Sequence, residues 1–500
     1  MDINDVLRRL QPYFERIPSV ERPKGHVPFK EKFGWTVAIL LLYFILVNVP
    51  VFGLDPSSID IFAQYRAFFA GATGSILALG IGPIVTASIV LQLLVGAGII
   101  SLDLTNPEDR ATYQDFQRFL VFVMIALEAF PQVVGGLLKP NLDVANALGV
   151  PPSVLSFLIF LQLFIGGVLI VYMDEVVSKW GIGSGVSLFI LASISQAIVV
   201  GLFNWFNPQG GMPPGVFPRL VWMFQNYPLE YLLSTDGLIT LFVDGGILAL
   251  ITTIIIILLV VFAEGTRVEI PLAHHLVRGA RGRFPIKLIY ASVLPMIFVR
   301  ALQALIVSVG FMLYNNGVKF LGEYAPGTAT PISGIMYLLS PVNSPYDWVP
   351  AFVKDPSRNS LAPYFADMPD WMIILHLIID ATILIVGGIL FAKFWVETSG
   401  MDAKTVANQI ARSGLQIPGF RKSPQVLERI LSRYIPKVTI LGGAIIGVLT
   451  LIANMLGTVG NVSGTGLLLA VSIAYRFYED LTREQLTEMH PMLRKFLGEE

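Results

Sequence analysis

The chain of 500 residues contains no cysteine. Disulfides, thiolate metal sites and cysteine nucleophiles are therefore excluded. Charged residues are also scarce, at 14% of the sequence, where soluble domains carry about 25%. The net charge of −1 provides no overall field for a nucleic acid, so such contacts would need local basic clusters. Together with 54% hydrophobic residues, these shortages predict a polytopic membrane protein and argue against a soluble multi-domain enzyme.

Motifs for catalysis and cofactor binding are missing as well. The sequence has no GxxxxGKS or GxxxxGKT phosphate loop and no HExxH zinc motif. Its five histidines are scattered, and His274 and His275 fall in a loop where solvated side chains are the usual role. We therefore expect no metal, no cofactor and no enzymatic activity. Residues 1–34 carry many charges and no apolar core, so we expect no cleavable signal peptide and a first membrane helix that acts as the targeting signal.

Long apolar runs dominate the rest of the sequence, and a membrane span needs roughly 20 such residues. We predict an all-α polytopic membrane protein with ten transmembrane helices, at about 35–52, 58–98 (broken), 117–138, 153–173, 184–203, 244–263, 287–312, 370–395, 437–457 and 463–479. An even number of spans places both termini on one side. Of the 34 lysines and arginines, 27 fall in segments that face the cytoplasm when the N-terminus is inside. Both termini are therefore expected to be cytoplasmic.

The second span is interrupted where a membrane helix is normally continuous. Between an amphipathic piece at 58–70 and the following apolar stretch, the run is broken by Gly71, Gly74, Gly80, Gly82 and Pro83. Freed backbone groups cannot face lipid, so a broken span lines a cavity or other protein. Gly- and Pro-rich features recur in spans 2 and 7 and in spans 5 and 10 with reversed direction. The pattern indicates two inverted five-helix halves around a central pore, with chance recurrence as the alternative.

Ionisable residues inside spans often mark transport pathways. Glu128, Arg300 and Asp380 are the clear cases here, and for Arg300 and Asp380 we favour local capping or pairing between helices. The side chains beside the Gly and Pro breaks are aliphatic. Individually such residues are ordinary packing. Together they predict a dry constriction that blocks ions and yields to a bulky chain.

Two cytoplasmic loops are unusually long and basic. The segment 399–437 is expected to form a helix, a turn and a second helix at 424–434, with Arg421 and Lys422 at the tip. The loop 264–287 adds three arginines, Arg278, Arg281 and Arg283. The bias of basic residues toward the inside explains isolated lysines, but it does not explain two long basic fingers. Such tips suit a phosphate backbone or an acidic protein, so we expect a large cytoplasmic partner.

Several blocks of the sequence together resemble a known family. The strongest are LGIGPIVTASIVLQLLVGAGII (79–100), MDEVVSKWGIGSGVSLFI (173–190), RVEIPLAHHLVRGARGRFPIK (267–287), FWVETSGMDAK (394–404), IPGFRKS (417–423) and GTGLLLAVSIAYRFYE (464–479). In this order, over nearly the whole chain, they resemble SecY, the channel subunit of the Sec protein translocon. The likeness is to its archaeal form, which is similar to the alpha subunit of the eukaryotic translocon in the endoplasmic reticulum. The outer segment 313–369 matches least, and we have no mechanism for it.

The resemblance implies a set of functional residues. A hydrophobic pore ring would consist of Ile81, Val85, Val186, Ile190, Ile297 and Leu469. A plug at about 58–74 would include Phe62, Tyr65, Arg66, Phe68 and Phe69. A lateral gate between spans 2 and 3 and spans 7 and 8 would include Thr86, Gln92, Glu128, Gln303 and Leu305. Leu305 stands where the family often has asparagine, and Gln303 is a candidate substitute. The five basic residues of the two loops, Arg278, Arg281, Arg283, Arg421 and Lys422, would dock the ribosome.

The resemblance also implies partners and a function. A SecE-type small membrane subunit would clamp the two halves, usually with a third small subunit of the SecG or beta type. The expected function is a passive protein-conducting channel in the cell membrane, or in the endoplasmic reticulum membrane if the source is eukaryotic. It would translocate secretory proteins, insert membrane proteins laterally into the bilayer, recognise signal sequences and nascent chains, and be driven by the ribosome or another cytoplasmic partner. An ion-coupled secondary solute transporter and a ribosome scaffold without conduction are the alternatives.

The expected domain organisation follows the two halves. The N-terminal half would comprise 35–203 and the C-terminal half 244–479, with an outer loop at 204–243 between them. Residues 1–34 and 480–500 would form cytoplasmic ends. The C-terminal half would contain the basic loops at 264–287 and 396–437 and the outer loop at 313–369.

Overall fold

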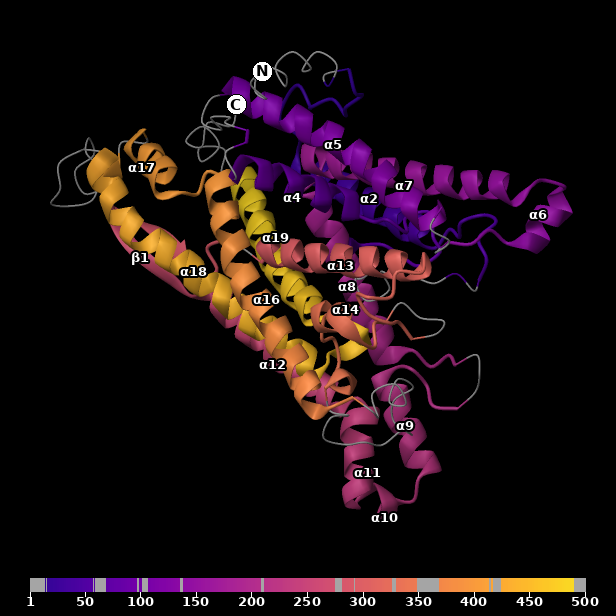
Figure 1. Cartoon of the computed structure of the whole chain (residues 1–500). Helices are drawn as coiled ribbons and strands as arrows, with labels where there is room; N and C mark the ends of the chain where they lie inside the picture. The colour runs from indigo at the N-terminus through magenta and orange to yellow at the C-terminus, as the bar shows by residue number, and fades with distance from the viewer. Residues whose placement is uncertain are drawn as a thin grey trace.

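A computed structural model describes residues 14, 16–56, 58, 69–96, 99–100, 107–134, 138–207, 211–274, 281–291, 293–325, 330–348, 368–412, 415–416 and 424–489. This part of the chain is almost entirely helical (Figure 1). The long helices are α2 (Phe29–Val47), α4 (Gly82–Gly96), α5 (Pro107–Val134), α7 (Pro152–Trp180), α8 (Gly185–Phe203), α12 (Ile247–Gly265), α13 (Leu294–Asn315), α16 (Asp370–Thr398), α18 (Pro424–Leu456) and α19 (Gly464–Met489).

Seven helical stretches in the described residues are long and apolar enough to cross a membrane, and Gly82–Val95 is a shorter apolar helix. Helices α2 and α19 fall outside the seven because charged residues such as Lys32 and Arg476 lie within them. The mostly helical, membrane-type fold agrees with the sequence prediction. The number of ten spans stays a prediction.

The break in the second span is resolved into a loop followed by a helix. Helix α4 begins only at Gly82, and Pro83 lies in its first turn, where the missing N–H has no helical partner to lose. Gly80 has a φ of 56°, and a Cβ there would lie 2.1 Å from the carbonyl oxygen of Phe69. Only glycine adopts this conformation at so close an approach without strain. The chain therefore turns back on itself just before α4.

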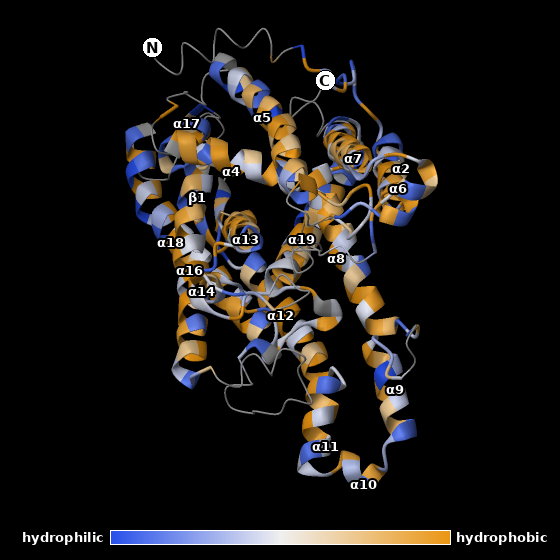
Figure 2. Cartoon of the chain, turned by 45° about the vertical axis from the view of Figure 1, so that its right-hand side comes forward, coloured by the Kyte–Doolittle hydropathy of each residue, from blue (hydrophilic) through white to orange (hydrophobic). Residues whose placement is uncertain are grey.

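The connection between α8 and α12 forms a helical hairpin of its own. It contains α9 (Val216–Asn226), α10 (Leu229–Leu232) and α11 (Thr235–Ile239), and a π-helical turn at Thr240–Asp244 leads into α12. The hairpin extends away from the other helices (Figure 2). Its base is tied by Arg219, whose Nη1 donates to the carbonyl oxygen of Asp244 at 2.8 Å.

The two basic loops have more regular structure than the sequence indicates. The first is a β-hairpin of β1 (Arg267–His274) and β2 (Arg281–Lys287), and the short β3 (Leu415–Gln416) pairs with the other edge of β1. The second contains α17 (Ala403–Arg412) and the start of α18. The prediction of a separate helix at 424–434 before a span at 437–457 is wrong. Helix α18 runs continuously through Pro436, and Leu427, Leu431 and their neighbours pack it on α17 and the sheet.

A central apolar cluster joins the two halves of the chain. It takes buried side chains from α2, the start of α4, α7 and α8 in the first half, and from α12, α13, α16, α18 and α19 in the second. Helices α16 and α18 approach closely through glycines, since a Cβ on Gly388 would lie 3.0 Å from the carbonyl oxygen of Gly443. Small residues of this kind allow tight helix packing in membranes.

Two ion pairs hold the end of α19 to both halves. Lys32 of α2 lies 2.8 Å from a carboxylate oxygen of Glu484, and Lys287 of β2 lies 2.8 Å from one of Glu479. The start of α2, the β-hairpin and the end of α19 therefore lie at one end of the molecule. The side of the membrane that this end faces stays a prediction.

Candidate functional site

Of the six aliphatic residues expected to form a ring, five belong to the central apolar cluster and Val186 packs against it. They are contributed by the start of α4 (Ile81, Val85), α8 (Val186, Ile190), α13 (Ile297) and α19 (Leu469). The five residues in the cluster are at most 5% exposed, and Val186 is partly buried. None of these side chains can coordinate an ion. Segments more than 380 residues apart thus contribute to one apolar cluster, and their arrangement as a ring stays a prediction.

The end of the expected plug is fastened to the start of α4. Phe69 is 7% exposed, and its carbonyl oxygen accepts from the N–H of Ile81 at 2.7 Å. The hydroxyl of Tyr43 donates to the carbonyl oxygen of Ala70 at 3.1 Å, and Ala70 itself has a positive φ of 54°. Phe69 therefore lies directly against the ring residue Ile81. The other expected plug residues, Phe62, Tyr65, Arg66 and Phe68, lie outside the described residues.

Three expected gate residues line one small pocket of about 20 Å³ between α4, α5 and α13. Thr86 of α4 donates to Oε1 of Glu128 of α5 at 2.6 Å, and Leu305 of α13 lines the pocket opposite them. Phe69 is also part of its wall. The polar pair of the first half thus faces an aliphatic side chain of the second half.

The two glutamines expected at the gate lie elsewhere. Gln303 does not substitute for the missing asparagine, because its amide bonds with Arg300, Asp380 and the main chain of Leu339. It faces away from Thr86 because it lies on a different side of α13 from Leu305. Gln92 is 4% exposed, and its Oε1 has no hydrogen-bond partner among the described residues.

A buried ion pair connects α13 and α16. Nη1 of Arg300 lies 2.9 Å from Oδ1 of Asp380, with the two side chains 1% and 0% exposed. Gln303 bonds with both partners, and Nε of Arg300 lies 3.4 Å from the hydroxyl of Thr465 in α19. The expectation of local pairing between helices is confirmed for these two residues. The pair is therefore a packing element of the second half and does not line the pocket of Thr86, Glu128 and Leu305.

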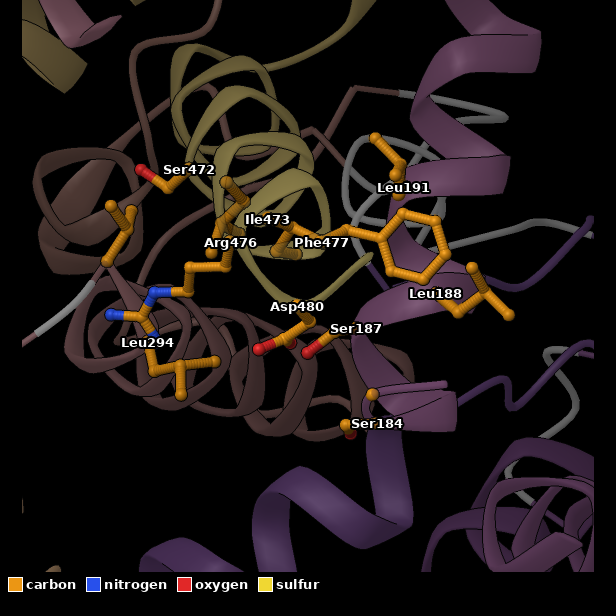
Figure 3. A pocket seen from close by; sticks show the side chains of 13 residues that line it. Ser184, Ser187, Leu188, Leu191, Leu294, Ser472, Ile473, Arg476, Phe477 and Asp480 are labelled. Atoms are coloured by element: carbon orange, nitrogen blue, oxygen red, sulfur yellow. The ribbon is translucent and has the colours of Figure 1, made fainter. Parts of the chain in front are cut away.

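A larger pocket, of about 190 Å³, adjoins the ring at the end of the molecule that carries the β-hairpin. It lies between the start of α8, the start of α13 and α19, and Leu469 of the ring forms part of its wall (Figure 3). Ser187 and Asp480 point toward each other across it, with Arg476 on the same helix as Asp480. Oδ1 of Asp174 accepts from the N–H of Val186 at 2.8 Å and fixes the first turn of α8 beside it.

Sequence reasoning did not predict the polar residues of this pocket. Ser184, Ser187 and Arg476 all lie in blocks that carried the resemblance, GIGSGVSLFI and AYRFYE. A signal was therefore present, but only the aliphatic residues of those blocks were assigned to the pore. That the start of α8 and the end of α19 line one pocket follows only from the tertiary structure.

The described part of the basic surface is internally paired. Nη1 of Arg283 lies 2.5 Å from Oε2 of Glu269 across the β-hairpin, although the arginine side chain is 75% exposed. The hydrogen bond and charge of Arg283 hold the pKa of Glu269 below its usual value. Arg281 lies in β2, and Arg278, Arg421 and Lys422 lie outside the described residues. Among described residues, no group of three or more histidines and carboxylates could hold a metal.

Comparison with protein families gives two matches that together cover most of the chain. The SecY family model matches residues 75–478. The model of the plug domain of Sec61p matches residues 41–74. The boundary between the two falls in the loop that precedes α4.

Curated relatives match over the full length. A protein translocase subunit SecY from Archaeoglobus fulgidus is 75% identical over 499 residues, which cover 100% of both chains. A protein translocase subunit SecY from Haloferax volcanii is 52% identical, covering 98% of this chain and 99% of its own.

Solved structures agree with the sequence comparisons. One described as the structure of a protein conducting channel superposes with a TM-score of 0.75 at 39% identity, covering 96% of this chain and 98% of its own. Another, Sec61 in the canine ribosome-channel complex from the endoplasmic reticulum, has a TM-score of 0.72 at 39% identity, with the same coverage.

Proposed function

The chain belongs to the SecY family, and from that premise we propose how it conducts polypeptides. It is the channel subunit of a protein translocase, and its substrates are polypeptides that cross the membrane or enter it. The observation that carries the mechanism is the gathering of six aliphatic side chains from α4, α8, α13 and α19 into one cluster.

We propose that these six residues form the pore ring. At rest the ring is a dry constriction, and ions meet a dewetting barrier there. Phe69 packs beside Ile81 at the end of the plug, which closes the outer side of the ring. A polypeptide in transit replaces the plug and fills the ring with its own side chains. The channel then stays closed to ions while it conducts a chain.

The small pocket of Thr86, Glu128 and Leu305 is proposed as the lateral gate. At this pocket, α4 and α5 of the first half face α13 of the second half, and few polar groups lie between them. A signal sequence is an apolar helix, and burying its surface contributes about 25 cal/mol per Å². Such a helix opens the gate only if it binds the separated halves better than the closed ones. A membrane-protein segment leaves into lipid through the same opening.

The proposed topology has ten spans with both termini in the cytoplasm. The seven apolar helices and α4 account for eight spans, and α2 and α19 are proposed as the other two. The ion pairs of Lys32 with Glu484 and of Lys287 with Glu479 support one common side for the start of α2 and the end of α19. The basic loops then face the cytoplasm, and the cell membrane is the proposed location.

The proposed channel is passive and depends on partners. A ribosome or another cytoplasmic partner supplies the driving force and docks on the basic loops, in line with the ribosome complexes of structural relatives. A SecE-type subunit and a third small subunit are proposed to hold the halves together. The transporter alternative gains no support from the buried ion pair, since Arg300 and Asp380 bond with each other and line neither pocket.

The test is cross-linking of a stalled nascent chain to the ring. Photoreactive side chains at Val85 and Ile190 should both give adducts with the chain, and one at Ile255, which is 50% exposed on α12, should not. Absence of adducts at both ring positions, with the nascent chain bound, would count against conduction through the ring.

A further inference from the structure

The segment 339–342 consists of the last residue of α14 (Gly334–Leu339) and the three non-helical residues after it, and it lies between α13 and α16. Helix α14 packs on both of these helices (Figure 1). On α16 the segment contacts His376 and Asp380. At a rise of 1.5 Å per residue, these two residues lie about 9 Å and 15 Å along α16 from Asp370, the first residue of that helix. In a spanning helix these positions reach the hydrocarbon layer. Main-chain groups outside helices must be bonded within the protein at that depth.

Polar side chains of α13 and α16 make these bonds. Each joins a side chain to the main chain of the segment: Gln303 Nε2 donates to the carbonyl oxygen of Leu339 at 2.8 Å, His376 Nε2 lies 2.7 Å from that of Ser340, and Asp380 Oδ2 accepts from the N–H of Val342 at 3.4 Å. All three side chains are at most 3% exposed. The segment is therefore held from α13 on one side and from α16 on the other.

Arg300 connects these anchors to each other. Its Nη1 donates to Oδ1 of Asp380 at 2.9 Å and to Oε1 of Gln303 at 2.5 Å. Nε2 of Gln303 also donates to Oδ1 of Asp380 at 3.1 Å. Thr465 of α19 lies at the edge of the cluster, 3.4 Å from Nε of Arg300. One buried cluster thus links α13, α16, α19 and the segment 339–342.

The anchored side of α13 is opposite to its gate side. Residues advance by about 100° each around a helix. Ile297 of the ring and Ala301 and Leu305 of the gate pocket therefore share one face, while Arg300 and Gln303 lie on the other. Val299 and Met296 lie on the anchored side too, close to Gly387 and Gly388 of α16. The polar cluster is thus placed to determine where α13 presents its gate face.

We propose that Arg300 and Gln303 are positioning residues of the gate, and that the segment 339–342, which is also bonded to α16, anchors α13 in the position that the structure shows. This inference rests on the proposed function. The cluster defines one position of α13 against α4 and α5. When the bond between Gln303 and Leu339 is lost, the free-energy difference between this position of α13 and alternative positions becomes smaller. A weakly apolar signal sequence can then displace α13. The cluster therefore sets how apolar a signal sequence must be.

The test removes the side-chain amide of Gln303, which bonds with Leu339, Arg300 and Asp380, while the Arg300–Asp380 ion pair stays. In Gln303→Leu we compare the export of two reporters that differ only in the apolar core of the signal sequence, one normal and one shortened. The matched control is Ser308→Ala, because the buried Ser308 hydroxyl donates only within α13, to the carbonyl oxygen of Ala304 at 2.7 Å. The ratio of weak-signal to normal-signal export should rise by at least about threefold to tenfold in Gln303→Leu, the factor that a single hydrogen bond contributes, and should stay unchanged in Ser308→Ala.

The ratio separates positioning from stability. A variant that merely folds poorly lowers the export of both reporters together and leaves their ratio unchanged. An unchanged ratio in Gln303→Leu would overturn the inference, and if that variant does not accumulate, Gln303→Met makes the same comparison. Failure of the wild-type chain to export the normal reporter would instead count against the proposed function.

Discussion

Replacing Asp380 by leucine should destabilise the protein strongly, because it leaves the guanidinium of Arg300 buried without a counter-charge. Arg300 is 1% exposed, and its remaining partners, Gln303 and Thr465, are neutral. Removing one member of a buried ion pair costs about 3–5 kcal/mol. A charge at the centre of a membrane helix costs about 2.5–3.5 kcal/mol on insertion scales, which agrees. At 1.4 kcal/mol per factor of ten, the folding equilibrium should fall by more than about two powers of ten.

The double variant Arg300→Met with Asp380→Leu makes the prediction specific. When both charges are replaced by apolar side chains of similar volume, the desolvation penalty of both disappears, and stability should return to within about 1 kcal/mol of wild type or exceed it. Thr465→Val is the control in the same cluster. Its contact with Arg300 is long, at 3.4 Å, so it should cost no more than about 1 kcal/mol.

The assay is unfolding in detergent micelles, followed by the fluorescence of the seven tryptophans. The three variants and the wild-type protein are compared under one detergent and lipid composition. The reasoning would be refuted if Asp380→Leu unfolded within about 1 kcal/mol of wild type, well below the cost of a buried unpaired charge. A double variant as unstable as Asp380→Leu would also contradict it.

Three further predictions concern the channel. Ile190→Asn should raise the resting conductance in planar bilayers because an amide hydrates the ring, whereas Ile255→Asn on the exposed side of α12 should not, and a tight Ile190 variant would argue against the ring. A disulfide between cysteines at Thr86 and Leu305, which line one pocket, should block signal-sequence insertion until it is reduced; normal insertion by the oxidised form would reject the gate. Arg421→Glu should weaken ribosome binding and translocation with assembly intact, and unchanged affinity would show that this residue does not dock the partner.

Some features were predictable because they depend on local properties of the chain. Glycine and proline interrupt a membrane helix wherever they cluster, so the break around Gly80 and Pro83 could be placed before the fold was known. A charge inside a span needs a partner at close range, and the pairing of Arg300 and Asp380 was expected for that reason. The pore ring was reached both from the aliphatic residues beside these breaks and from the family resemblance.

Other features depend on neighbours that are distant in the sequence. Gln303 was assigned to the gate from its proximity to Leu305 along the chain. The helical period turns it to the other side of α13, where Asp380 and the main chain of Leu339 take up its amide. The helix at 424–434 and the span at 437–457 are separate elements in the sequence prediction, whereas α18 is one helix through Pro436. Packing of its first turns on α17 and the sheet stabilises a continuous helix instead.

By itself the sequence determined that the chain is a membrane protein with an interrupted second span, because hydropathy and the backbone preferences of glycine and proline act over a few residues. Only the tertiary structure decided which side chains share the ring, the gate pocket and the buried cluster. Ile81 and Leu469, for example, are buried in one cluster to which helices from both halves contribute. Their burial is a property of that packing, and no short stretch of the chain encodes it.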